Sequence, residues 1–195
     1  MNSNIQISKK ASGQVLLRSI IKNGNCLLSS QLQSRIQIKE FDMEIERKFL
    51  TKYLPKDLDS YPFHLIEQAY LTTDPVIRVR KEDEKYFITY KGKGLLAREE
   101  YNLPLTKEAY DTLKSKADGN LISKKRILIP FNGLTIELDI FEPPFAPLIL
   151  AEVEFSSIEE ANSFEGPEWF DEDVTNDTKY HNSTMSRVSM PDDPC

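Results

Sequence analysis

Cysteine is scarce in this chain of 195 residues, which contains only Cys26 and Cys195. Neither cysteine lies in a CxxC motif or in a Cys/His spacing typical of a zinc site, and the two are too few for a disulfide framework. The sequence therefore predicts reduced thiols in a reducing compartment, and so a cytoplasmic protein.

Long hydrophobic runs are absent, and the longest are short pieces such as residues 147–152. A membrane-spanning helix needs roughly 20 apolar residues, so we predict no membrane span. With 7 glycines, 11 prolines and 29% charged residues, the composition excludes collagen-like, low-complexity and wholly disordered chains. We expect a globular chain with one domain of ordinary size.

Acidic residues are missing from residues 1–39, which carry six bases and many serines. This composition is typical of a transit peptide, and a disordered extension is the alternative interpretation. We therefore expect residues 1–42 to be a disordered or targeting extension, with a mitochondrial location if it acts as a transit peptide. Residues 43–195 are expected to form the folded domain.

The rest of the chain is acidic, since residues 40–195 hold 19 bases against 31 acids. A surface of that sign repels the phosphates of duplex nucleic acid, so a nucleic-acid duplex is not an expected partner. Any basic binding surface must be local and internal.

Short segments with period-2 alternation, rich in β-branched and aromatic residues, recur from Met43 onward. They predict eight strands, at about 43–51, 63–72, 76–82, 85–92, 98–104, 122–130, 134–142 and 148–156.

The turns between these segments predict antiparallel neighbours. Asn132-Gly133 favours a type I′ hairpin, because that turn needs positive φ at both positions. Residues 106–116 and 157–164 have the start signals of surface helices. We predict a mainly β fold in which eight antiparallel strands close into a barrel with a few flanking helices, since closure removes exposed edges.

Charges recur at positions i and i+2 within the expected strands, which places both side chains of a pair on one face of the sheet. The opposite face of the same strands is largely apolar. The pairs also sort by sign, and they are Glu44/Glu46 followed by Lys48, Arg78/Arg80, Lys124/Arg126, Glu137/Asp139 and Glu152/Glu154.

Two interpretations of this charged face remain open. It is either a solvated surface of a sheet whose other face is packed by helices, or the lining of the barrel. Converging carboxylates favour a hard divalent cation such as Mg²⁺ or Mn²⁺, and facing arginines and lysines favour a polyanion. A metal ion bound by the acidic pairs, together with phosphates bound by the basic pairs, would account for both kinds of pair.

The motif Glu44-Ile45-Glu46-Arg47-Lys48 resembles the Glu-x-Glu-x-Lys signature of the CYTH superfamily, the triphosphate tunnel metalloenzymes. The similarity covers residues 43 to about 187. It continues in order through residues 68–71, 78–80, 89–91, 98–100, 124–126, 137–141, 151–155, 175–177 and 180–182. Ala69 and Lys179 are mild departures from the family pattern.

The resemblance implies an eight-stranded barrel that encloses a tunnel, and a role for each charged motif residue. The implied ligands of the divalent metal are Glu44, Glu46, Asp139, Glu152 and Glu154. The implied triphosphate-binding residues are Lys48, Arg78, Arg80, Lys91, Arg98, Lys124 and Arg126. Lys91 and Tyr70 match positions that assist hydrolysis in some members, Glu154 is expected to position water, and Glu100 and Glu137 are further motif positions.

The expected function is hydrolysis of the terminal phosphoanhydride of tripolyphosphate by a monomer or homodimer, with Mg²⁺ or Mn²⁺. ATP and thiamine triphosphate are alternative substrates, adenylyl cyclase is an alternative activity of the same superfamily, and a non-catalytic polyphosphate or nucleotide binder is the alternative of a different class. His64 and His181 are interpreted as ordinary structural or surface residues, and Trp169 as a packing aromatic.

Overall fold

The computed structural model describes residues 5–9, 15–19 and 43–189. The chain divides into two compact units, Met1–Glu40 and Phe41–Cys195. The first unit contains β1 (Ile5–Lys9) and β2 (Val15–Ser19), which pair antiparallel with Ile7 opposite Leu17. The targeting role expected for residues 1–42 stays a prediction, and most of that segment lies outside the described residues.

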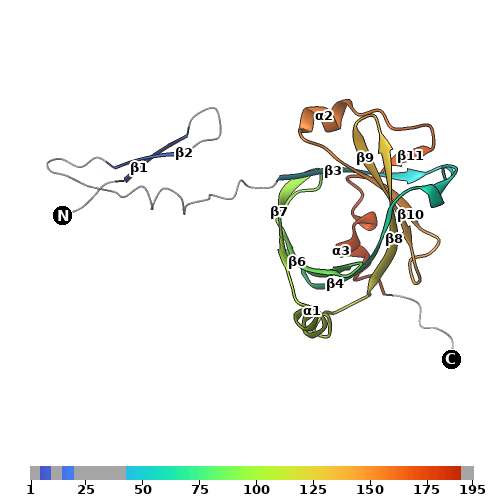
Figure 1. The fold of residues 1–195 in the computed structure, drawn as a ribbon, viewed down its shortest axis with the longest axis horizontal. Helices are drawn as coiled ribbons and strands as arrows, with labels where there is room; N and C mark the ends of the chain where they lie inside the picture. The colour runs from blue at the N-terminus through green and yellow to red at the C-terminus, as the bar shows by residue number, and fades with distance from the viewer. Residues whose placement is uncertain (1–4, 10–14, 20–42, 190–195) are drawn as a thin grey trace. The chain divides into compact units, whose positions relative to one another are not determined.

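The second unit is built around a closed barrel of eight antiparallel strands (Figure 1). Its strands are β3 (Met43–Thr51), β4 (Phe63–Thr73), β5 (Val76–Glu82), β6 (Lys85–Lys91), β7 (Ala97–Pro104), β8 (Ile122–Phe131), β9 (Leu134–Phe141) and β10 (Ile149–Glu154). Pairing of β10 with β3 closes the ring, with Glu154 opposite Glu46 and Glu152 opposite Lys48. The predicted barrel is confirmed.

One strand of the second unit was not predicted, and neither were β1 and β2 of the first unit. β11 (Phe170–Asp173) adds to β3 on the outside of the ring. Its sequence, Phe-Asp-Glu-Asp, has no apolar alternation, so the sequence pattern does not predict a strand there. The strand forms because it pairs with β3, which is more than 100 residues away in the chain. Backbone hydrogen bonds from Lys52 to Trp169 and from Val174 to Lys48 fix its ends.

Three short helices accompany the barrel in the described part of the chain; two of them pack on its outer face, and the third contributes residues to the cavity wall. They are α1 (Lys107–Lys114), α2 (Ile158–Ser163) and α3 (Asn182–Met185), with 3₁₀ turns at Leu58–Ser60 and Thr178–Tyr180. Figure 1 shows α1 and α2 outside the ring. The side chains of Thr106 and Ser157 cap the first turns of α1 and α2, as the sequence predicts. None of the described helices is long and apolar enough to cross a membrane.

Most of the apolar core lies between the barrel and the outer elements, because the strands carry apolar side chains on their outward face. Tyr110 of α1 packs on Ala69 and Val79 in this outer layer. Met185 of α3 instead packs with Tyr70 and Leu150, which lie on the inner face of the barrel at the α3 end. A larger cluster includes Phe49, Leu138, Val153, Ala161, Trp169 and Phe170. Away from the α3 end, charged side chains fill most of the inner face of the barrel.

The β8–β9 hairpin has the predicted turn, with φ of 49° at Asn132 and 84° at Gly133. Gly133→Ala is expected to lower the free energy of unfolding by about 1 kcal/mol, because a Cβ disfavours this left-handed backbone and would touch nothing within 4 Å that could compensate. Urea unfolding measures the change. Gly92→Ala is the matched control, since its Cβ would make ordinary contact with Glu99 at 3.5 Å; an equal loss in both variants contradicts the prediction.

Candidate active site

A cavity of about 220 Å³ lies inside the barrel, and charged side chains form most of its wall. Seven strands contribute these side chains, each from the face opposite the apolar one. Six bases and seven acids line it: Lys48, Arg78, Arg80, Lys91, Arg98 and Arg126, with Glu44, Glu46, Glu82, Glu100, Glu137, Glu152 and Glu154. The charged face predicted from the sequence is therefore the lining of the barrel, and the solvated-surface interpretation is wrong.

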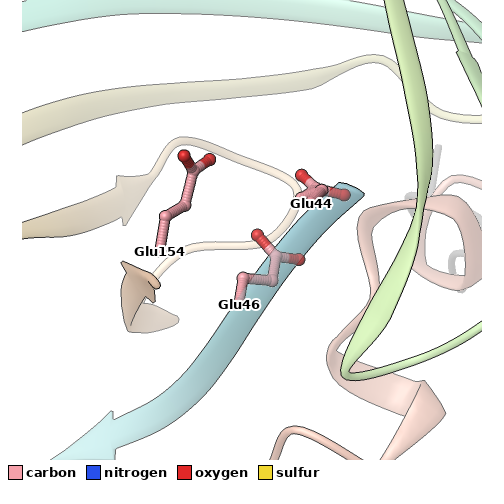
Figure 2. A group of neighbouring side chains, drawn as sticks. All are labelled: Glu44, Glu46 and Glu154. Atoms are coloured by element: carbon pink, nitrogen blue, oxygen red, sulfur yellow. The ribbon is translucent and has the colours of Figure 1, made fainter. Parts of the chain in front are cut away.

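Three of the acids form a cluster that fits a cation. Glu44 and Glu46 come from β3, and Glu154 comes from the end of β10 (Figure 2). One carboxylate oxygen from each lies within 4.8 Å of the others. Carboxylate oxygens gathered this closely are the ligands that Mg²⁺ and Mn²⁺ prefer, so the residues fit a hard divalent ion.

The environment of Glu154 raises the pKa of its carboxyl. Desolvation by the surrounding barrel wall, together with the negative charges of Glu137, Glu44 and Glu46, raises the pKa of Glu154 to about 7. Its side chain remains reachable by solvent. At neutral pH this carboxyl therefore exchanges between a protonated and an ionised form.

Lys48 forms ion pairs with two acids deep in the cavity. Its Nζ lies 2.8 Å from Glu46 Oε1 and also contacts Glu152. Burial alone lowers a lysine pKa, but the negative charges of Glu152 and Glu46 outweigh this effect and raise the pKa of Lys48. Lys48 is thus a permanent cation in the wall.

Lys91 and Arg98 reach the same carboxylate cluster from β6 and β7. Lys91 Nζ lies 2.5 Å from Glu44 Oε1 and 2.6 Å from Glu100 Oε2. Arg98 Nε donates to Glu44 Oε2 at 2.9 Å, and its Nη2 lies 3.3 Å from Glu46. Burial, with the positive charge of Arg78, lowers the pKa of Lys91. Two of the cluster's three carboxylates are therefore held by bases.

Arg78 and Arg80 differ from these bases, because their carboxylate partners are distant. Arg78 Nη2 is 3.6 Å from Glu100, and Arg80 Nη1 is 3.6 Å from Glu82. Within the described part of the chain, the buried Nε–H groups of both arginines have no hydrogen-bond partner. Burial and the charges of Arg78 and Arg126 lower the pKa of Arg80 to about 10. Buried donors without acceptors, inside a cavity, are suited to an anion.

Sequence comparison places this charged barrel among known proteins. The CYTH domain profile matches residues 42–187. The chain belongs to the CYTH family. It is 38% identical over 154 residues to an inorganic triphosphatase of Nitrosomonas europaea, covering 76% of this chain and 99% of that protein.

Two further comparisons give the same family. An inorganic triphosphatase of Acetivibrio thermocellus is 33% identical over 152 residues, covering 73% of this chain and 92% of that protein. The crystal structure of the inorganic triphosphatase NE1496 matches with a TM-score of 0.58 and 34% identity, covering 76% of this chain and 96% of that one.

Two residues of the CYTH set lie away from the cavity lining. Lys124 and Asp139 pair with one another, and both side chains have 0% exposure. Burial, with the charge of Arg126, lowers the pKa of Lys124 to about 8, and its Nζ lies 5.2 Å from the ring centroid of Phe141. The barrel thus gathers the other charged motif residues at the cavity and seals this pair in its wall.

Arg126 joins the cavity to that sealed pair. Its guanidinium contacts Glu137 and Glu152, which line the cavity, and donates from Nε to Asp139 Oδ1 at 2.7 Å. Asp139 therefore sets the position of Arg126 in this CYTH barrel, and Lys124 contributes part of the neutralising charge.

Tyr70 lines the cavity beside Arg78 and is 4% exposed. Gln68 connects these two residues, because its Nε2 donates to the Tyr70 hydroxyl at 3.3 Å and its Oε1 accepts from Arg78 at 3.2 Å. The Tyr70 hydroxyl is thus fixed next to a base of the CYTH motif.

Sequence reasoning missed several residues of the wall. Both histidines line the cavity, as do Asn182 and Ser183. His181 Nε2 lies 3.0 Å from the carbonyl oxygen of Thr175, and burial lowers its pKa. His64 lies on β4 but has no charged residue two positions away, and His181, Asn182 and Ser183 lie at a 3₁₀ turn and a four-residue helix, so the charged alternation of the strands pointed to none of them.

Proposed function

We propose that this protein is a divalent-metal-dependent triphosphatase that hydrolyses the terminal phosphoanhydride of inorganic tripolyphosphate. The names of its two curated relatives support this activity. The observation that carries it is the pair of unpartnered, buried Nε–H groups of Arg78 and Arg80 in the cavity that holds the carboxylate cluster. Donors for an anion and ligands for a cation meet in one space.

Glu44, Glu46 and Glu154 would hold the metal, which we propose to be Mg²⁺ or Mn²⁺. When bound, a divalent ion polarises phosphoryl oxygens and orients an attacking water. Glu152 and Asp139, the other ligands implied by the family resemblance, already contact Lys48, Lys124 and Arg126. These two acids would bind a metal only after the bases had left them to contact the substrate.

The six bases would hold the triphosphate. Arg78 and Arg80 can donate at once, because their Nε–H groups are unpartnered among the described residues. Lys91 and Arg98 first have to leave Glu44 and Glu46. A cation on these carboxylates frees the two bases, and an anion on the bases frees the carboxylates. Metal and substrate are therefore expected to bind with mutual reinforcement.

Hydrolysis requires an in-line water and neutralisation of the charge that moves to the leaving phosphate. Glu154 is the solvent-exposed member of the carboxylate cluster, so we assign the positioning of the attacking water to it. Lys91 and Tyr70 would stabilise the leaving group, and the remaining bases would hold the chain extended. The reaction needs no covalent nucleophile.

The pKa of Glu154 gives a testable pH dependence. A carboxyl with a pKa of about 7 is mostly protonated at pH 6 and mostly ionised at pH 8. Because a protonated carboxyl is a poor ligand, affinity for Mn²⁺ is expected to rise by up to about tenfold between these values. Calorimetry with the substrate-free protein measures the Mn²⁺ affinity at each pH. Tripolyphosphate is left out because its own protonation changes over the same pH range.

Glu154→Gln is the control for that measurement, since it cannot titrate. The variant is expected to bind Mn²⁺ more weakly and to lose the pH dependence. Equal Mn²⁺ affinity of the unmodified protein at pH 6 and pH 8 contradicts the assignment of Glu154 as a ligand.

The test of the proposed function is phosphate release by the full chain with Mg²⁺ or Mn²⁺, offering tripolyphosphate, ATP and thiamine triphosphate in parallel. Faster hydrolysis of tripolyphosphate than of the organic triphosphates supports the proposal. Formation of cyclic AMP from ATP identifies a cyclase instead, and tight binding without turnover identifies a non-catalytic binder.

Two further proposals concern the setting of the enzyme. We propose a cytoplasmic location because cysteine is scarce, or a mitochondrial one if the basic segment 1–42 is a transit peptide. The protein would act as a monomer or homodimer. Light scattering of the purified chain and imaging of chains with and without residues 1–42 test these points.

A further inference from the structure

His64 lies at one end of the cavity, away from α3. It shares the inner face of β4 with Tyr70, and both residues line the cavity. They are six positions apart, which is about 20 Å along β4. Tyr70 packs with Tyr180 and Met185 of the C-terminal segment. His64 therefore lies at the opposite end of the tunnel from α3. It is outside the family motif on β4, which covers residues 68–71.

A turn residue holds the ring of His64 in place. Asp83, in the β5–β6 turn, lies with its Oδ2 at 2.7 Å from His64 Nδ1. Asp83 is itself fixed to β4, because its Oδ1 accepts from the Leu65 amide at 2.9 Å and its own amide donates to the Leu65 carbonyl at 2.9 Å. These hydrogen bonds, which we call the Asp83 clamp, depend on the left-handed backbone of Asp83, whose φ is 51°.

The Asp83 clamp leaves one polar atom of the ring, Nε2, for another partner. Two arginines that line the same cavity can share an anion with His64: Arg80, whose Nε–H has no hydrogen-bond partner among the described residues, and Arg126, which also contacts carboxylates. His64 stands directly opposite Arg126 in the β4–β8 register, and directly opposed residues on one face have Cβ atoms about 5 Å apart. Two acids also line the cavity here: Glu82 of β5, and Glu137, which contacts Arg126.

We propose that His64, oriented by Asp83, is a substrate-contacting residue whose Nε2–H donates to a phosphate oxygen at the end of the tunnel beside Arg126. The proposal rests on the proposed function, because it takes a linear polyphosphate as the ligand. A phosphate oxygen accepts only from a protonated nitrogen, so the contact places a proton on both ring nitrogens. The Asp83 carboxylate accepts from the first, and the phosphate accepts from the second.

Nitrogen NMR of the full chain tests the contact directly. The protein has two histidines, so a ¹⁵N–¹H spectrum contains two imidazole rings, and His64→Gln assigns them. On titration with tripolyphosphate without metal, His64 Nε2 is expected to move toward the shift of a protonated nitrogen. In Asp83→Asn this response is expected to weaken, whereas Asp111→Asn, which changes an exposed ion pair on α1, is the matched control and leaves it intact.

Kinetics measure the effect on the substrate. His64→Ala is expected to raise KM for tripolyphosphate about 5- to 10-fold with kcat changed less than twofold, because a charge-assisted hydrogen bond to the bound chain is lost. Asp83→Asn raises KM less, the double variant resembles His64→Ala, and His64→Gln, which keeps a donor, restores part of the affinity. The His64 side chain is 36% exposed, so the variants are expected to fold, and thermal unfolding verifies it.

The outcomes separate this proposal from the proposed function. Hydrolysis by the unmodified protein with unmoved His64 nitrogens, or with an unchanged KM in His64→Ala, overturns the His64 contact alone. A His64 response without any hydrolysis supports the contact and overturns the triphosphatase assignment. Absence of both hydrolysis and a nitrogen response overturns both proposals.

Discussion

Glu46→Gln is expected to reduce metal-dependent hydrolysis about 100-fold or more while the barrel stays folded. Glu46 belongs to the carboxylate cluster and contacts Lys48 at 2.8 Å and Arg98 at 3.3 Å. Glutamine keeps the shape of the side chain but removes the charge that a hard cation requires. Lys48 retains Glu152 and Arg98 retains Glu44, so neither base is left buried without a carboxylate.

Phosphate release at increasing Mg²⁺ concentration measures this loss, with thermal unfolding as the check on folding. Glu108→Gln is the matched control, because it makes the same chemical change on the exposed first turn of α1. If Glu46→Gln is as active as the control, Glu46 is not a metal ligand. The proposed binding of the triphosphate by the arginines would not be affected by that result.

Arg80→Ala is expected to raise KM for tripolyphosphate about 30-fold with a smaller effect on kcat. Arg80 is half-buried, and its buried Nε–H is unpartnered among the described residues, so it donates to the substrate without first breaking a close ion pair. A hydrogen bond from a charged group contributes roughly 1.5 to 3 kcal/mol, which corresponds to this range of affinity. Because the contact exists in both the ground and transition states, its loss is expected to change KM more than kcat.

The same substitution is expected to leave the substrate-free protein equally stable or more stable. Burial and the charges of Arg78 and Arg126 lower the pKa of Arg80 to about 10, which means that the folded barrel disfavours its charge. Removing it relieves that repulsion. Arg126→Ala gives the contrast, since it leaves Asp139 and Glu152 with one base fewer and is expected to lower the melting temperature.

Kinetics and thermal unfolding with and without tripolyphosphate test both statements. Arg80→Lys keeps the charge but loses the fork of donors, and is expected to fall between the alanine variant and the unmodified protein. Lys81→Ala, the next residue on β5 and absent from the cavity lining, is the matched control. An unaltered KM in Arg80→Ala would show that the substrate does not reach the β5 wall.

The strands and their charged face were predictable because both follow from local order. Side chains alternate with period 2 along a strand, so Arg78 and Arg80 had to share a face whatever the rest of the chain did. Asn132-Gly133 required positive φ at both turn positions, and the backbone has it. The motif around Glu44 and Glu46 added the family, and with it the closed barrel.

What the sequence by itself determined, then, is the set of strands, the face on which each charge lies and the family. Only the tertiary structure decided which charges meet. The β10–β3 pairing brings Glu154 opposite Glu46, whereas the β8–β9 pairing seals Lys124 against Asp139 in the wall. It also left Arg78 and Arg80 with unpartnered Nε–H groups and clamped His64 to Asp83. Pairing between distant strands depends on how the whole sheet closes, and no local pattern carries that information.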